Sequence, residues 1–94
     1  MSFNNDSTLR NEITLKAQFE KLAASYSVHT RRFKRSVVRR YLAFAGVNVT
    51  LGEITPETLD DFIRWQFEKG LQESTVCKTR VIREIVNSAM PDRI

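Results

Sequence analysis

Apolar residues recur along the first half of the chain at helical spacing. They form two stretches, at about residues 12–25 and 30–45. The apolar positions are Leu15, Phe19, Leu22 and Tyr26 in the first stretch and Phe33, Val37, Tyr41 and Phe44 in the second. Residues three, four and seven positions apart share one face of an α-helix. The pattern predicts two amphipathic helices, and Gly46 ends the second because glycine suits a left-handed C-cap.

The sequence around Thr55 predicts the start of a third helix. Threonine is a good N-cap, Pro56 fits the first helical turn, and Glu57 complements the helix dipole. The inward residues of this helix are Leu59, Phe62, Ile63 and Phe67. The helix runs to about Lys69, and Gly70 is expected to end it.

A fourth helix is predicted over about residues 75–89, with Ser74 as its N-cap. Its inward residues are Val81, Ile82, Ile85, Val86 and Ala89. No stretch of the chain alternates apolar and polar residues as a strand does. We therefore expect an all-α fold, a compact four-helix bundle formed by residues 12–90. Residues 1–11 are predicted to be a flexible N-terminal arm and residues 91–94 a C-terminal tail.

The composition narrows the classes of function. A chain of 94 residues is long enough for one hydrophobic core. No stretch approaches the roughly 20 apolar residues needed to cross a bilayer, and the N-terminus lacks the basic and apolar segments of a signal peptide. One cysteine, Cys77, and one histidine, His29, allow neither an internal disulfide nor a zinc site. We expect a soluble, cytoplasmic protein with no membrane partner, metal or cofactor.

Positive charge is concentrated in the second predicted helix. The chain has a net charge of +4, and residues 29–40 contain only basic charged side chains. At 100° per residue, an arc of about 100° opposite the apolar face holds Arg31, Arg32, Arg35 and Arg39. The planar fork of arginine binds phosphate and the guanine edge bidentately. This arc predicts an anion-binding surface, and a solvated surface that only keeps the protein soluble is the alternative.

The fourth predicted helix offers a second basic surface. Its cations are Lys78, Arg80 and Arg83. Thr75 and Thr79 lie near its N-terminal end, where small polar side chains can approach a phosphate. The third helix carries an excess of acids and is expected to face away from an anionic partner.

Catalytic chemistry is not predicted for this chain. Nucleophilic or acid–base catalysis needs a base within reach of a nucleophile or a metal, and His29 sits among arginines at a helix start. Tyr26 and Tyr41 lie on apolar faces and are assigned to the core. Cys77 is expected to be buried or half-buried, and Trp65, off the inward stripe, is a candidate interface residue.

Three short motifs follow one another along residues 12–90. The first is Ser27-Val-His-Thr30, then basic residues, then Val37, Tyr41, Leu42 and Phe44. The second is Leu51-Gly-Glu-Ile54-Thr55-Pro-Glu-Thr-Leu59 with Phe62-Ile63, and the third is Gly70-Leu71-Gln-Glu-Ser74-Thr75-Val76 with Arg83 and Ala89. Their order resembles the N-terminal core-binding, SAM-like domain of tyrosine recombinases, the phage-type integrases. Phe33 stands one position before the aromatic residue expected in the second helix, where this chain has Lys34.

The resemblance implies a domain that grips duplex DNA with its second and fourth helices during DNA integration or recombination. The expected DNA-binding residues are Thr30, Arg31, Arg32, Arg35, Arg39, Thr75, Lys78, Thr79, Arg80 and Arg83. A C-terminal catalytic domain of the same polypeptide would close on the DNA and cut it, with other recombinase protomers bound nearby. The chain itself is therefore expected to bind DNA and not to be an enzyme.

Two other functions stay open at this point. A SAM-like protein-interaction module would dock its arginine face on an acidic partner and its acidic third helix on a basic one, head to tail. Self-association without DNA binding would favour that alternative. A helix-turn-helix regulator ranks last, because the connection over residues 46–54 exceeds the usual turn of about three or four residues.

Overall fold

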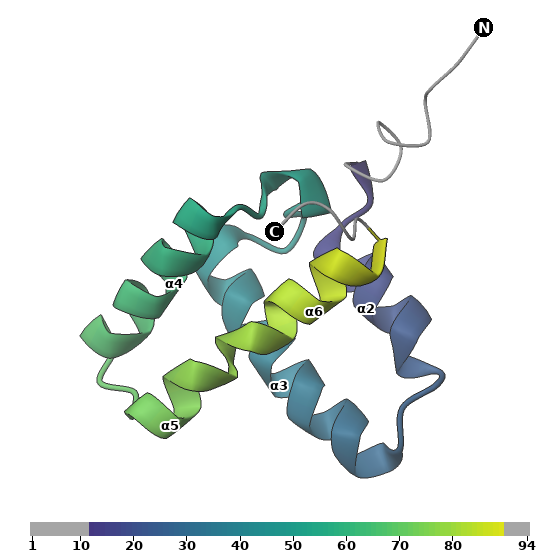
Figure 1. Cartoon of the computed structure of the whole chain (residues 1–94), viewed down its shortest axis with the longest axis horizontal. Coiled ribbons are helices and arrows are strands. Elements are labelled where there is room, and N and C mark those ends of the chain that lie inside the picture. The colour runs from purple at the N-terminus through teal and green to yellow at the C-terminus, as the bar shows by residue number, and fades with distance from the viewer. Residues whose placement is uncertain (1–11, 90–94) are drawn as a thin grey trace, which may run out of the picture.

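The computed structural model describes residues 12–89, whose path is shown in Figure 1. The predicted N-terminal arm and C-terminal tail lie outside the described residues. The helices are α2 (Leu15–Ala23), α3 (Val28–Ala45), α4 (Pro56–Glu68), α5 (Glu73–Val76) and α6 (Arg80–Ala89), and two 3-10 turns are η1 (Leu51–Glu53) and η2 (Cys77–Thr79). No strand forms within residues 12–89, which confirms the all-α class and the compact bundle. The run α5–η2–α6 takes the place of the fourth predicted helix.

Side-chain caps set the starts of the first two described helices. The hydroxyl of Thr14 accepts a hydrogen bond from the amide of Ala17 at 3.1 Å, and α2 begins at Leu15, the residue after Thr14. The hydroxyl of Ser27 accepts a hydrogen bond from the amide of Thr30 at 3.2 Å, so α3 begins at Val28. These bonds satisfy amides that have no partner inside the helix. Thr30 therefore lies within the first turn of α3 and does not start it.

Both ends of α4 form as the sequence predicts. The Thr55 hydroxyl caps the amide of Thr58 at 3.2 Å, and Pro56 occupies the first turn. At the other end, Gly70 adopts a φ of 84°, a left-handed conformation that glycine reaches without a steric penalty. The amide of Gly70 donates to the carbonyl of Phe67 at 2.9 Å, and that of Leu71 donates to the carbonyl of Gln66 at 3.1 Å. This pair of bonds is a Schellman motif, which closes the helix.

The fourth predicted helix is interrupted, and its predicted cap is wrong. Gln72 occupies the N-cap position of α5, and no side chain caps that helix, whereas Ser74 lies inside it. The interruption at η2 coincides with Thr79, whose hydroxyl donates to the carbonyl of Val76 at 2.7 Å. That hydroxyl also accepts a hydrogen bond from Nε2 of Gln66 at 2.8 Å. Threonine bonds of this kind compete with the regular helical pattern.

One hydrophobic core joins the helices. Its fully or almost fully buried members include Leu15, Phe19, Val37, Tyr41, Leu51, Ile54, Phe62, Val81, Ile82, Ile85 and Val86. In Figure 1, α6 crosses in front of α3, with α4 on one side and α2 on the other. Contacts between α6 and both α2 and α3 agree with this arrangement. The apolar spacing of the first, second and fourth predicted helices is therefore confirmed as core spacing.

The inward face of α4 is not the predicted one, and Ile63 is only half-buried and outside the core cluster. Phe67 is 49% exposed, whereas Gln66 is completely buried. Trp65 is partly buried against the core, and its ring lies 5.5 Å from that of Phe44 and 6.0 Å from that of Phe62. Trp65 is thus a member of an aromatic cluster, and its role as an interface residue stays a prediction.

The connection between α3 and α4 is ordered by backbone pairing. The amide of Leu15 donates to the carbonyl of Val49 at 2.9 Å, and the amide of Leu51 donates to the carbonyl of Ile13 at 2.8 Å. This isolated bridge fixes the connection against the start of α2, where Val49, Leu51 and Ile54 are buried. Within residues 12–89, the helices are too short or too polar to cross a membrane.

Candidate nucleic-acid interface

Arg31 forms two hydrogen bonds to the turn between α2 and α3. Its Nε donates to the carbonyl of Ala23 at 3.1 Å, and its Nη2 donates to the carbonyl of Tyr26 at 3.2 Å. Ala23 is the last residue of α2, and carbonyls at a helix C-terminus have no partner within the helix. A cation there also complements the negative end of the helix dipole. The side chain predicted to meet DNA is therefore a structural link between two helices.

Arg35 and Lys34 are also engaged within the chain. The Nη1 of Arg35 lies 2.8 Å from a carboxylate oxygen of Glu20, and its guanidinium lies 5.2 Å from the ring centre of Phe19. Lys34 Nζ lies 3.4 Å from a carboxylate oxygen of Glu84 on α6 and 4.5 Å from the ring centre of Tyr26. The positive charges of Arg35 and Lys34 are thus partly neutralised by carboxylates of the chain itself.

Arg32 and Arg39 are the arginines of α3 that remain exposed without an ion pair, counting only the described residues. At 100° per residue they project from the side of the helix opposite Val37 and Tyr41, which are buried. Arg40 is half-buried, and its Nη1 is enclosed without a hydrogen-bond partner. The outward side of α3 therefore presents two free guanidinium groups.

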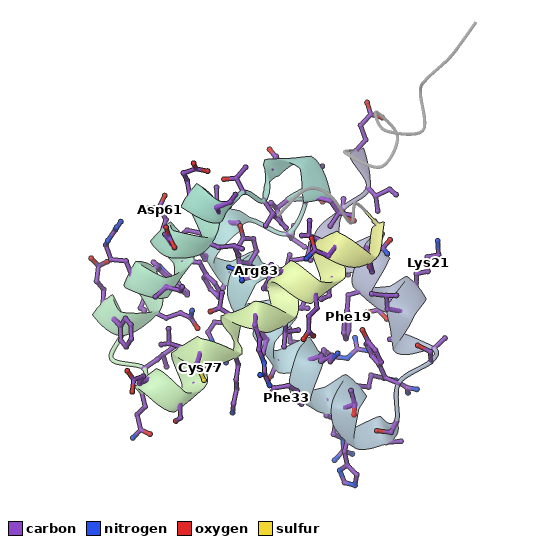
Figure 2. The ribbon with its side chains drawn as sticks, in the orientation of Figure 1. Phe19, Lys21, Phe33, Asp61, Cys77 and Arg83 are labelled. Carbon is purple, nitrogen blue, oxygen red and sulfur yellow. The ribbon has the colours of Figure 1, made fainter. Side chains whose placement is uncertain are left out.

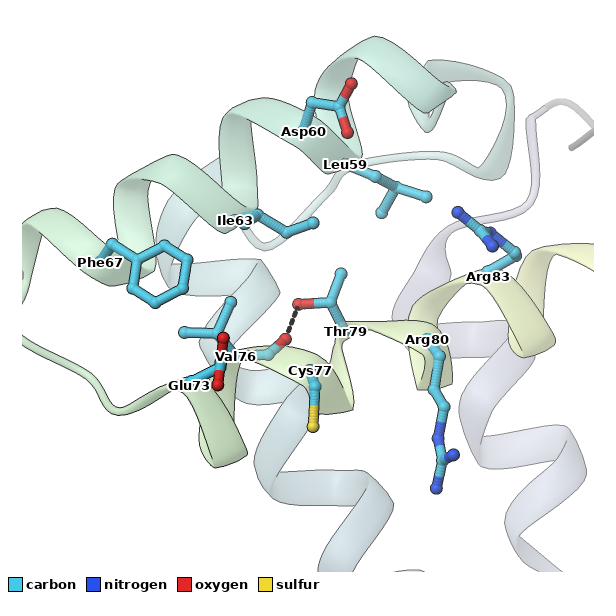
Figure 3. A pocket seen from close by; sticks show the side chains of 10 residues that line it. All are labelled: Leu59, Asp60, Ile63, Phe67, Glu73, Val76, Cys77, Thr79, Arg80 and Arg83. Carbon is cyan, nitrogen blue, oxygen red and sulfur yellow. Dashed lines mark hydrogen bonds between the residues drawn. The ribbon is translucent and has the colours of Figure 1, made fainter.

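Thr79 is predicted to bind DNA, but its side chain is buried. Only 6% of it is exposed, and its hydroxyl accepts a hydrogen bond from Gln66 and donates one to the carbonyl of Val76. Figure 3 shows the bond to Val76. Thr75 is half-buried in α5, and Thr30 is half-buried with its hydroxyl 3.0 Å from that of Ser27. Sequence periodicity alone did not reveal the burial of Thr79, because its partner lies on α4.

Lys78 brings η2 beside α3. Its Nζ lies 5.4 Å from the ring centre of Phe33, and Figure 2 shows Phe33 on α3 near the segment that carries Cys77. The ion pair of Lys34 with Glu84 places the neighbouring turn of α3 against α6. The N-terminal half of α3 and the start of the α6 segment thus lie together.

The two arginines of α6 are exposed but diverge. Figure 3 shows Arg83 directed toward Leu59 on α4 and Arg80 directed away from α4. Neither forms an ion pair with another residue of the described chain. The side chains predicted to act together on the fourth helix therefore point in different directions, although both residues line the same pocket beside α4.

The structure does not bring all the predicted cations of α3 and the α6 segment onto one surface, and a smaller set remains. Arg31 and Arg35 face α2. Phe33, whose ring lies beneath the ammonium group of Lys78, is on the other flank of α3. We call the basic face the set of cations, on α3 and at the start of the α6 segment, that have no ion pair, hydrogen bond or enclosed nitrogen within residues 12–89, which leaves out Arg31 and Arg40. It consists of Arg32, Arg39, Lys78 and Arg80.

The helix α4 carries the opposite charge. It carries Glu57, Asp60, Asp61 and Glu68, and Arg64 pairs with Asp61 at 3.0 Å. Inside the bundle, burial raises the pKa of the Tyr41 hydroxyl, which donates to the Thr58 hydroxyl at 3.3 Å. Tyr41 packs its ring against Phe62 at 4.8 Å, as a core residue does.

Other polar groups do not assemble into a reactive centre in the part of the chain described. No three His, Cys, Asp or Glu side chains there lie close enough to share a metal ion. Cys77 is exposed, which contradicts the prediction of burial, and its thiol donates to the carbonyl of Ser74 at 3.2 Å. Cys77 points outward because Val76 and Thr79 take the inward positions of this segment.

The fold and its surface define a small all-α domain with one basic face and one acidic helix. Comparison with known protein families, with curated proteins and with solved structures gave no match. The function must therefore be argued from the geometry of this chain.

Proposed function

We propose that this chain binds double-stranded DNA through its basic face, as the core-binding domain of a tyrosine recombinase. The observation that carries the proposal is the contact of Lys78 with Phe33, because it brings a cation of the α6 segment against α3, the helix that presents Arg32 and Arg39. A duplex backbone is long enough to touch both.

The four cations of the basic face lack carboxylate partners within the described residues, which supports an anionic ligand. Among residues 12–89, none of Arg32, Arg39, Lys78 and Arg80 has a carboxylate partner. Soluble surfaces usually mix charges of both signs, so an unpaired group of four favours an external anion. DNA supplies regularly spaced phosphates, whose bound counterions are released when cations of the protein replace them.

The chemistry of the side chains suggests a division of roles. Arg32 and Arg39 stand on the outward side of a long helix, and a helix of this width fits the major groove. Their forked guanidinium groups suit guanine edges as well as phosphates. Lys78 and Arg80 flank that helix and suit the phosphate backbone. Thr30 and Thr75, both half-buried, would contribute at most hydroxyl contacts at the margin.

The remaining parts of the proposal concern the parent protein. The acidic helix α4 would face away from DNA, because phosphates repel its carboxylates. DNA cleavage and rejoining would belong to a catalytic domain of the same polypeptide, which closes on the duplex from the other side. This chain would then hold DNA beside other protomers without cutting it. A cytoplasmic location would suit such a role.

The proposal is tested by fluorescence anisotropy of a labelled random-sequence duplex at two salt concentrations. The double variant Lys78→Ala/Arg80→Ala should bind about 30-fold more weakly, given about 1 kcal/mol for each lost phosphate contact. The slope of log K against log salt should become shallower by about 0.9 for each contact. The pair Arg32→Ala/Arg39→Ala should weaken binding to a similar or greater degree.

The matched control is Arg64→Ala/Lys69→Ala, which removes the same number of positive charges from the α4 region. Both control residues are exposed, so the fold should tolerate their replacement. This variant should bind DNA nearly as well as the wild type. If all double variants lose the same affinity, net charge and not the basic face governs binding. If the wild type binds no duplex even at low salt, the proposed function is wrong.

A further inference from the structure

A cleft of about 220 Å³ lies between α2 and α3, on a part of the surface that the sequence did not single out. Its apolar lining comes from Phe19, Val38 and Leu42, of which the first two are buried. The rest of its lining is charged, and the cations outnumber the carboxylate. These charged residues are Lys16 and Glu20 of α2 and Arg35 and Arg39 of α3.

Pairing within the cleft leaves part of its positive charge unbalanced. Glu20 pairs with Arg35 at 2.8 Å. Lys16 and Arg39 are exposed, and neither forms an ion pair within residues 12–89. A cleft in which one sign of charge stands beside apolar walls concentrates ions of the opposite sign. The cleft therefore has the electrostatics of an anion site.

The cleft lies on the flank of α3 away from Lys78. At 100° per residue, Arg35, which lines the cleft, and Phe33, which Lys78 contacts, are about 160° apart around the helix. Arg32 and Arg39 fall between them, on the outward side of α3. The outward arginines are thus flanked by an unpaired lysine on each side, which is Lys78 on one flank and Lys16 on the other.

We propose that this cleft is a second phosphate site, in which Lys16 and Arg39 hold a backbone phosphate of duplex DNA. The inference rests on the proposed function and adds α2 to the interface. A helix with its side chains is about 10–12 Å wide, and the major groove, about 12 Å wide, is bounded on each side by a phosphate backbone. With the outward side of α3 in that groove, Lys78 contacts one strand and Lys16 contacts the other.

The shared residue Arg39 favours DNA as the source of the anion. Arg39 belongs both to the basic face and to the cleft, so a ligand that covers the basic face reaches the cleft without a break. A duplex supplies a phosphate on each side of the groove for this purpose. Glu20 opposes such a ligand, because its carboxylate repels phosphate and occupies Arg35.

Fluorescence anisotropy of the full 94-residue chain with a labelled random-sequence duplex, at two salt concentrations, tests the site. Lys16→Ala should weaken binding about fivefold, and the slope of log K against log salt should become shallower by about 0.9. Lys21→Ala is the matched control, because Lys21 is also an exposed lysine of α2 but does not line the cleft. Figure 2 shows Lys21 directed away from the bundle, whereas Phe19 lies on the inner side of α2. The control should bind as the wild type does, and far-ultraviolet circular dichroism checks that each variant is folded.

Glu20→Gln gives a test of opposite sign. It removes the carboxylate from the cleft and frees Arg35, so binding should tighten about threefold. Glu68→Gln, which removes an exposed carboxylate from α4, should change the affinity much less.

The outcomes separate this site from the proposed function. A wild type that binds the duplex but loses equal affinity through Lys16→Ala and Lys21→Ala overturns the cleft site and leaves the proposed function standing. Glu20→Gln that binds no more tightly than Glu68→Gln also overturns the cleft site alone. A wild type that binds no duplex overturns both.

Discussion

Arg31 and Arg32 are neighbours with the same charge, yet the structure gives them different roles. Arg31 donates two hydrogen bonds to carbonyls at the end of α2, whereas Arg32 is exposed without a partner in the described chain. Replacement of Arg31 by alanine should therefore destabilise the fold, and replacement of Arg32 should not. The affinity for DNA should show the opposite order.

The size of the stability effect follows from the two bonds that are lost. A hydrogen bond to a charged group contributes about 1.5–3 kcal/mol when buried, and access of water reduces this for a half-buried side chain. About 1 kcal/mol for each bond gives a loss near 2 kcal/mol for Arg31→Ala, or a fall in Tm of roughly 10 °C for a domain of this size. Arg32→Ala should change the unfolding free energy by less than about 0.5 kcal/mol.

Urea unfolding monitored by tryptophan fluorescence measures this difference. Trp65 is the only tryptophan of the chain, and its ring packs among Phe44 and Phe62, so its emission should report loss of the core. DNA affinity is then measured at a temperature where both variants are folded. Equal unfolding free energies for the two variants would refute the structural role of Arg31. An equal loss of DNA affinity in the two variants would refute the assignment of a structural role to Arg31 and a DNA-binding role to Arg32.

Three further predictions concern other contacts. Thr79→Val should cost about 1–3 kcal/mol because it leaves the buried Nε2 of Gln66 without its partner, and adding Gln66→Leu should recover part of that loss in urea unfolding. Arg35→Ala should cost less than about 1 kcal/mol, and the cost should shrink in high salt, because the pair with Glu20 is partly exposed. Burial raises the pKa of Tyr41 above its ordinary value of 10.0, so its contribution to stability is complete below that pH and is lost as the pH rises through the raised pKa. Tyr41→Phe should therefore weaken the decline of the unfolding free energy at alkaline pH, and an unchanged decline would assign it to other groups.

The helices were predictable because their signals are local. Thr55, Pro56 and Gly70 act through the backbone of their own segment, and the structure places them at the ends of α4 as expected. The apolar spacing of Val81, Ile82, Ile85 and Val86 likewise identified a buried face without knowledge of its partner. A strongly one-sided helix has only one face to bury.

The inward face of α4 was not predictable from spacing alone. At 100° per residue Gln66 falls between Leu59 and Phe62, at the centre of the buried face, and it was left out of the prediction because its side chain is polar. Thr79 supplies a hydrogen-bond partner that makes burial of Gln66 favourable. Phe67 lies about 100° further round the helix than Gln66 and is left 49% exposed.

The candidate interface was predicted in outline and revised in detail. Periodicity located the arginines of α3 on the side away from the core, which holds for Arg32 and Arg39. It could not show that the side chains of Arg31 and Arg35 reach α2, because that depends on where α2 lies. Long basic side chains often lie along a neighbouring surface in this way.

Chemical-shift mapping by nuclear magnetic resonance tests the basic face most directly. An isotope-labelled chain is titrated with a short duplex, and the perturbed backbone amides are placed on the structure. The account predicts the largest perturbations between Arg32 and Arg39 and between Lys78 and Arg80, with little change along α4. Perturbations concentrated on α4, or spread evenly over the whole surface, would contradict it.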